Sequence, residues 1–188
     1  MVGGTRAQIL DVAERLVQTR GFNDFSYADV ASELAVTNAA LHYHFRTKAL
    51  LGDALIERYA GRFFAALDRI EATTTDRADR LREYVGLYRD VLEAERMCLC
   101  GVLAAEYQTL PEGMQSLVLR FFERNEAWVA RILVEGADED QLRAVGSAIE
   151  TAQMIVDALE GAVMISRARH DVERFSSVAE RLLAIVAL

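Results

Sequence analysis

Residues 26 to 48 constrain the fold more than any other part of the chain, because they predict two short helices joined by a tight turn. Ser26 is followed three residues later by Asp29, a variant of the capping box, so the first helix is expected to begin at about residue 27. After the turn, Thr37 can cap a second helix that runs to about His44. This pair is a helix-turn-helix, whose second helix can enter the major groove of DNA.

The segments on either side strengthen this interpretation. Residues 5–20 carry one stripe of apolar residues, which is typical of an amphipathic helix. Gly21 suits a left-handed end to that helix, and Phe22 and Phe25 supply apolar anchors. Thr47 can cap a further helix that opens at residue 48.

With these elements in order, residues 5 to 60 resemble the amino-terminal domain of TetR-family transcriptional regulators. The matching elements are the first helix, Gly21-Phe22, Asp29-Val30-Ala31, the run Leu41-His42-Tyr43-His44-Phe45, and Thr47-Lys48-Ala49-Leu50-Leu51. The resemblance implies a homodimer that binds operator DNA and responds to a small molecule. Four positions differ from the family pattern and change the groups that face the bases: Ala35 and Ala39 replace Gly, Asn38 replaces a basic residue, and His42 replaces Tyr.

Composition favours an all-α fold of about nine helices, since the chain is 52% hydrophobic, has one Pro and lacks strand-like alternation. We expect a three-helix DNA-binding domain at 1–48, with the motif at 26–45. A larger helical domain for effector binding and dimerisation is expected at 49–188. Without a signal peptide or a membrane-length apolar run, a cytoplasmic protein is expected, with no membrane partner and no cofactor.

The net charge of −8 is unusual for a DNA-binding protein, but its distribution is uneven. Residues 1–60 hold six Lys or Arg and seven Asp or Glu, whereas the remaining residues hold fifteen and twenty-two. The acidity is therefore concentrated outside the proposed DNA-binding domain.

The proposed DNA contacts come from the motif and its borders. Asn38 can read adenine edges or bind phosphate, and Lys48 suits a phosphate at the start of the next helix. Tyr43 and His44 can hold the DNA backbone, although both can instead pack inside the small domain. The full set is Ser26, Tyr27, Thr37, Asn38, Ala40, His42, Tyr43, His44 and Lys48.

A heptad-like apolar row predicts the dimer interface. It lies on one long helix expected from Asp138 to about His170, and a final helix at about 171–187 adds to it. The predicted interface residues are Ile149, Ala152, Val156, Leu159, Val163, Val178, Leu182 and Ile185. The alternative is that the same rows form a single monomeric core.

The effector pocket is expected to be mostly apolar and aromatic, which suits a small hydrophobic ligand. Its predicted lining is Tyr84, Tyr88, Met97, Cys98, Tyr107, Phe121, Phe122, Trp128, Met154 and Asp157. Residues 97–106 also resemble a segment of some TetR-like regulators in which a Cys at the position of Cys98 senses electrophiles or oxidants. Most buried cysteines, however, only pack.

Three other readings are weaker. His42 and His44 lie two apart on a helix and point to opposite sides, so no metal site is predicted. A Cys98-dependent enzyme would need a neighbouring base, and the body has no His before His170. A helical adaptor without sequence-specific DNA binding remains open. The preferred prediction is a repressor that a hydrophobic or electrophilic effector releases from a palindromic operator.

Overall fold

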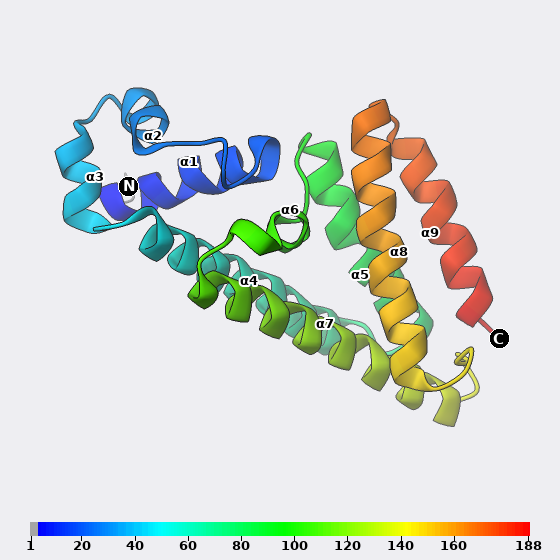
Figure 1. The fold of residues 1–188 in the computed structure, drawn as a ribbon. Helices are drawn as coiled ribbons and strands as arrows, with labels where there is room; N and C mark the ends of the chain where they lie inside the picture. Colours follow the sequence, from blue (N-terminus) through cyan, green and yellow to red (C-terminus); the bar gives the residue numbers. More distant parts are fainter. Residues whose placement is uncertain (1–3) are drawn as a thin grey trace. The chain divides into compact units, whose positions relative to one another are not determined.

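The computed structural model describes residues 4–188 and is all-α over that range, as the sequence predicts (Figure 1). The described residues form nine α-helices and one 3-10 turn, and no β-strand. The helices are α1 (Thr5–Arg20), α2 (Tyr27–Leu34), α3 (Asn38–His44), α4 (Lys48–Thr73), α5 (Arg77–Glu93), α6 (Leu99–Ala105), α7 (Glu112–Asp138), α8 (Ala148–Arg169) and α9 (Val172–Val186), with η1 at Tyr107–Thr109. Within the described range, no helix is both long and apolar enough to cross a membrane.

The chain divides into two compact units, and their borders differ from the boundary expected at residue 48. The first unit is Met1–Arg62 with Leu99–Arg120, and the second is Phe63–Cys98 with Phe121–Leu188. Both α4 and α7 are therefore shared between the units, and each unit contains segments that are distant in sequence.

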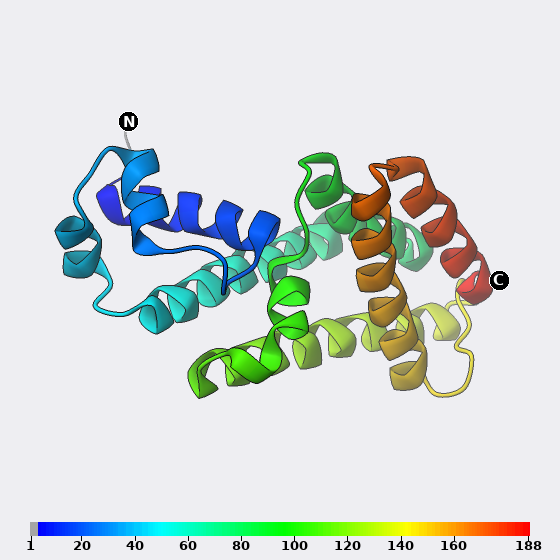
Figure 2. The same cartoon turned by 45° about the horizontal axis from the view of Figure 1, so that its top comes forward.

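In the first unit, α1 and α2 lie side by side and the chain turns sharply at Gly21 (Figure 2). Gly21 has φ +98°, and a Cβ there would lie 2.7 Å from Oε1 of Glu106. The Glu106 carboxylate accepts hydrogen bonds from the backbone N–H groups of Phe22, at 2.6 Å, and Asn23, at 3.3 Å. Gly21 is thus required both for its backbone conformation and for the close approach of Glu106.

A buried ion-pair group ties α1 to α4 in the same unit. Glu14 is only 7% exposed, and its carboxylate pairs with Arg58 at 2.9 Å and with Arg62 at 2.5 Å. Arg58 also pairs with Asp11 at 2.8 Å. Burial of the Glu14 charge is offset by two cations, which is the arrangement that a buried carboxylate requires.

In the second unit, α8 and α9 pack along each other and both contact α5 (Figure 1). Ala152, Val156, Leu159 and Val163 of α8 are all at most 1% exposed, and they pack in one core with Tyr84 and Phe175. The apolar row of α8 is therefore internal to the single chain.

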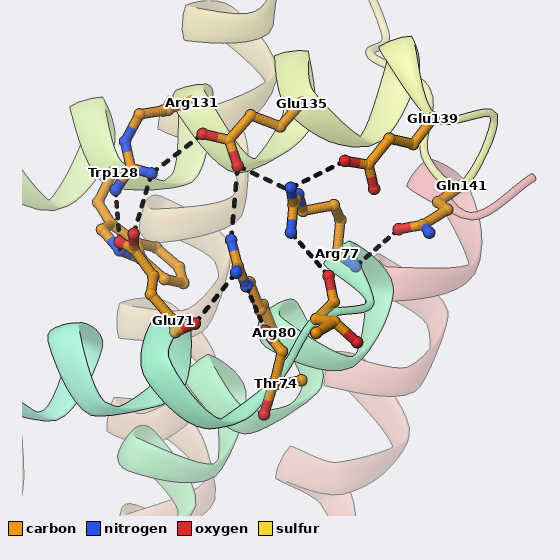
Figure 3. A network of polar contacts seen from close by, with 10 residues as sticks. Glu71, Thr74, Arg77, Arg80, Trp128, Arg131, Glu135, Glu139 and Gln141 are labelled. Carbon is orange, nitrogen blue, oxygen red and sulfur yellow. Dashed lines mark hydrogen bonds and ion pairs between the residues drawn. The ribbon is translucent and has the colours of Figure 1, made fainter.

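A polar network closes the end of this unit where α4, α5 and the second half of α7 meet (Figure 3). Arg80 donates to the carbonyls of Thr74, at 2.7 Å, and Glu71, at 3.1 Å, and pairs with Glu135 at 3.4 Å. Arg131 pairs with Glu71 at 2.5 Å. Arg80 thus supplies donors to carbonyl groups that the end of α4 leaves without helical partners.

The expected long helix from Asp138 to His170 is wrong. The structure continues α7 to Asp138 and begins α8 at Ala148. Gly146 has φ +88°, and Ser147 and Glu150 form a capping box that starts α8. Gly136 lies inside α7, and a Cβ there would lie 2.6 Å from Cδ1 of Leu142 in the following loop.

Candidate DNA-binding surface and effector site

The helix-turn-helix forms with the expected caps. The Asp29 carboxylate accepts from the Ser26 backbone N–H at 2.7 Å, and hydrogen bonds from Ser26 lower the pKa of Asp29. Ala35 adopts the left-handed conformation at φ 53°, although it carries a Cβ. Thr37 then caps α3, and its hydroxyl accepts from the Ala40 backbone N–H at 3.3 Å.

Two buried residues hold α3 and leave its other face outward. Leu41 is fully buried and Phe45 is 4% exposed, whereas Tyr43 is 84% exposed. Thr37, Asn38 and His42 are also exposed, while Ala40 and His44 are half-buried. The structure therefore presents most of the predicted contact residues on the outward face of a short anchored helix.

The side chains of Tyr27 and His42, both predicted to contact DNA, also contact each other. Their ring centroids are 4.7 Å apart, and the Tyr27 hydroxyl donates to the Phe45 carbonyl at 2.8 Å. Nδ1 of His42 lies 3.3 Å from the Arg46 carbonyl, which can only accept, so this nitrogen is the donor. Tyr27 thus fastens α2 to the end of α3, a structural role that the sequence did not reveal.

Lys48, predicted to bind a phosphate, is half-buried at the start of α4. Its Nζ lies over the rings of Phe22, at 4.6 Å from the centroid, and Phe25, at 4.4 Å. Burial lowers the pKa of Lys48. Arg46, two residues earlier, is exposed and was not predicted. The signal for Arg46 was its position directly after the α3 anchor Phe45.

In the second unit, five rings form an aromatic cluster: Phe63, Tyr84, Tyr88, Phe121 and Trp128. Tyr84 stacks on Trp128 with centroids 5.4 Å apart, and Phe63 forms T-shaped pairs with Tyr84 and Tyr88, each at 6.4 Å. Phe63 also contacts Phe121 at 5.1 Å. Four of these five residues were predicted to line the effector pocket, and Phe63 was missed.

The polar groups of this cluster form a closed triangle. The Tyr84 hydroxyl donates to Oδ1 of Asn125 at 3.0 Å, and Nδ2 of Asn125 donates to the Tyr88 hydroxyl at 2.9 Å. The two tyrosine oxygens are 3.1 Å apart, so Tyr88 donates to Tyr84. Burial raises the pKa of both tyrosines. Asn125 is fully buried, and sequence reasoning missed it.

Glu160 lies beside this triangle, and its charge acts on both tyrosines. The Cys98 thiol, itself 2% exposed, hydrogen-bonds to the Glu160 carboxylate. Oε1 of Glu160 is buried without a hydrogen-bond partner among the described residues. Burial, reinforced by the charge of Asp157, raises the pKa of Glu160 to about 7.

The remaining predicted pocket residues are scattered. Phe122 contacts Phe121 at 5.4 Å, and Met97 packs against the core of the second unit. Met154 is 37% exposed and Asp157 is exposed, so neither side chain is enclosed with the aromatic cluster. Tyr107 belongs to the first unit. A groove of about 510 Å³ lies elsewhere, between α5 and α9, and none of the predicted pocket residues lines it.

The predicted dimer residues fall into two groups. Ala152, Val156, Leu159 and Val163 are buried in the single chain, and Leu182 is 6% exposed, so they offer almost no surface to a partner. Ile149 and Ile185 are each 44% exposed, and Val178 is half-buried. The seam expected at the interface is therefore core, as the monomeric alternative had it, and any dimer surface on α8 must lie beside it.

Family models match most of the chain. A model described as bacterial regulatory proteins, tetR family, matches residues 9–55. A second model, for the tetracyclin repressor-like C-terminal domain, matches residues 78–182, more than half of the chain. The chain belongs to the TetR family. It is a TetR-family transcriptional regulator with an amino-terminal helix-turn-helix, as the sequence predicted.

Individual relatives agree with this family over nearly their full length. The TetR-family regulator from Agrobacterium tumefaciens superposes with a TM-score of 0.94, at 28% identity and 97% coverage of both chains. The transcriptional repressor DhaR of Mycobacterium sp. strain GP1 is 22% identical, covering 92% of this chain and 89% of DhaR. The repressor NemR of Escherichia coli K12 is 23% identical, covering 97% and 94%.

Proposed function

We propose that this TetR-family regulator represses transcription as a homodimer, bound to an inverted-repeat operator and released by a small molecule. The observation that carries the proposal is the outward face of α3, where Tyr43 is 84% exposed beside the fully buried anchor Leu41. A large exposed ring on a short anchored helix suits insertion into the major groove. A regulator of chromosomal operators would act in the cytoplasm.

The exposed residues divide between base reading and backbone binding. Asn38 carries both a donor and an acceptor, so it can pair with two atoms of an adenine edge. Tyr43 and Arg46 can reach phosphates, in addition to Lys48 at the start of α4. Base readers determine the preferred sequence, whereas phosphate contacts raise affinity for every sequence.

The effector would bind at the aromatic cluster in the second unit. A reversible ligand suits this site better than an electrophile, because the thiolate is the reactive form of cysteine. Cys98 is 2% exposed and lies beside the carboxylate of Glu160, and both features disfavour a second negative charge there. If an electrophile acts instead, release from DNA should disappear in Cys98→Ser and persist in Cys100→Ser.

Selection of bound sequences from random DNA tests the proposal. We expect an inverted repeat whose half-site centres are roughly 34–36 Å apart, or a multiple of that spacing. Asn38→Ala should relax the preference at particular bases. Arg46→Ala should weaken binding to all sequences alike and reduce the salt dependence of log K by about one unit.

Arg89→Ala is the matched control, since Arg89 is an exposed arginine on α5 in the other unit. Its salt dependence should equal that of the wild type. Selection without any enriched motif would contradict the proposal and favour the adaptor alternative. Higher transcription from an operator-linked promoter in the presence of the protein would indicate an activator.

A further inference from the structure

Glu160 is a charged residue in a position that favours apolar ones. It lies on α8 four residues after Val156 and three before Val163, and these valines are 1% and 0% exposed. Its Oε1 atom is buried and has no hydrogen-bond partner in the described part of the chain. A buried acceptor without a partner destabilises the fold, and more so when it is charged. Packing alone therefore does not explain this residue.

The groups around Glu160 do not neutralise its charge. The Tyr84 and Tyr88 hydroxyls donate within their triangle with Asn125, so neither proton is left for the carboxylate. The Cys98 thiol reaches it, but a thiol is a weak donor. The charged residue that acts on Glu160 is Asp157, which is another carboxylate.

Two other enclosed carboxylates of this chain, Glu14 and Glu71, have cations. Glu14 pairs with Arg58 and Arg62, and Glu71 pairs with Arg131 at 2.5 Å while it accepts from Nε1 of Trp128, also at 2.5 Å. Oε1 of Glu160 is buried as well, but within residues 4–188 no cation pairs with this carboxylate.

The residues around Glu160 also indicate which chemical class of cation could bind there. Tyr84 and Tyr88 are fully buried at this end of the aromatic cluster, and Phe63 is half-buried against both rings. The negative faces of aromatic rings attract organic cations, and their apolar surface suits alkyl groups. Because the rings pack at 5.1–6.4 Å, a ligand here must be small or must displace Phe63.

We propose that Glu160 and the rings of Phe63, Tyr84 and Tyr88 bind a small organic cation, an alkylamine or quaternary ammonium, as the effector. The cation pairs with the Glu160 carboxylate, and its alkyl part lies against the rings. This inference rests on the proposed function and names the chemical class of its ligand. Since burial raises the pKa of Glu160 to about 7, the incoming cation displaces a proton from part of the population at neutral pH.

Calorimetry on the full chain without DNA tests this proposal, with butylammonium and 1-butanol as probes of similar size. At pH 8 the wild type should bind butylammonium at least tenfold more tightly than 1-butanol. Glu160→Gln should weaken butylammonium binding at least tenfold and leave 1-butanol binding unchanged. Glu180→Gln removes an exposed carboxylate from α9 and should behave as the wild type.

A second measurement needs no variant. At pH 7 the heat of butylammonium binding should depend on the ionisation enthalpy of the buffer, because Glu160 releases a proton. Affinity should fall about tenfold from pH 8 to pH 6, since only the charged carboxylate pairs with the cation. The titratable neighbours are Tyr84, Tyr88, Cys98 and Asp157, and the raised pKa of each tyrosine keeps it protonated over this range.

Two outcomes would overturn the proposal. Equal affinity for 1-butanol and butylammonium would leave an apolar pocket in which Glu160 takes no part. Binding of neither probe would leave Glu160 as a protonated core residue. The selection of operator sequences is independent of both results. An enriched DNA motif without cation binding would therefore contradict the proposed ligand class and leave the proposed function in place.

Discussion

Glu160 should also make the stability of the free protein depend on pH. Its pKa is about 7 in the folded chain and lies near 4.5 when the chain unfolds, so the folded state holds more protons between these values. The free energy of unfolding should therefore fall as pH rises from about 5 to about 7, by on the order of 2–3 kcal/mol. Below about pH 4.5 both states are protonated, and the effect of this residue is constant.

Urea denaturation at pH 5 and pH 7.5 measures this slope, and the difference between wild type and Glu160→Gln isolates one residue from all others. The variant should lack the decrease and should be more stable than the wild type at pH 7.5. Parallel pH profiles for the two proteins would show that the Glu160 carboxylate is ionised in the folded state without cost.

At the scale of single residues, patterns in the sequence predicted the buried apolar residues well and the buried polar groups poorly. Leu41 and Phe45 follow helical spacing, which predicts that both are buried. Glu160 and Asn125 are polar residues within apolar rows, and the sequence alone does not distinguish their burial from exposure at the edge of a helix. The contact of Lys48 with Phe22 and Phe25 was not predicted, because helical spacing gives the position of Lys48 on α4 but not which rings lie nearby.

Among the contacts between elements, those of Arg80 join α4, α5 and α7 in the second unit. The Arg80 side chain is 11% exposed and joins the last turn of α4 to Glu135 on α7. Arg80→Ala leaves the carbonyls of Glu71 and Thr74 without these donors, and Glu135 without one of its cations. We expect a loss of about 3 kcal/mol in the free energy of unfolding.

Thermal and urea unfolding of Arg80→Ala check this value against Arg82→Ala. Arg82 is on the same helix, but its side chain is 60% exposed and pairs with Asp79 at the surface. Such a surface pair contributes about 0–1 kcal/mol, so the control should stay close to the wild type. Similar losses in both variants would mean that the network in Figure 3 adds nothing beyond the helical propensity of arginine.

The start of a helix was predictable where no apolar repeat ran across its capping residues. It was missed where the apolar repeat continued across the cap. Ser26 and Asp29 mark the start of α2 clearly because the apolar repeat of α1 ends before them, at Gly21. Ser147 and Glu150 form the same capping box at α8, as the structure confirms. There, the spacing of Leu142 and Val145 continued the repeat of α8 into the preceding loop, so the cap was overlooked. A capping box together with a Gly should outweigh a continuous repeat.

For the whole molecule, the family and the all-α fold class could be predicted from one ordered motif, but the division of the chain into two compact units could not. Each unit combines segments that are distant in sequence, so residues 99–120 belong with the amino-terminal helices. A single sequence shows which faces are apolar without showing which partners cover them. This explains why Ala152 and Val156 were assigned to a dimer interface although they lie in the core of one chain.

The dimer surface on α8 should instead be the row Met154, Ala158, Gly161 and Ile165, spaced four, three and four residues apart. Met154 and Ile165 are 37% and 41% exposed, and a Cβ on Gly161 would meet no atom within 4 Å, so a partner helix can approach closely.

Light scattering at micromolar concentration should give twice the 21.0 kDa chain mass for the wild type. Ile165→Glu should give a folded monomer, because a two-fold interface receives the new charge twice and each buried ion costs several kcal/mol. Met164→Glu is the control: Met164 is 48% exposed but points about 100° away around the helix, so its variant should remain a dimer. If both variants remain dimers, the interface does not lie on this row. If both become monomers, the interface covers a wider part of the outer face of α8.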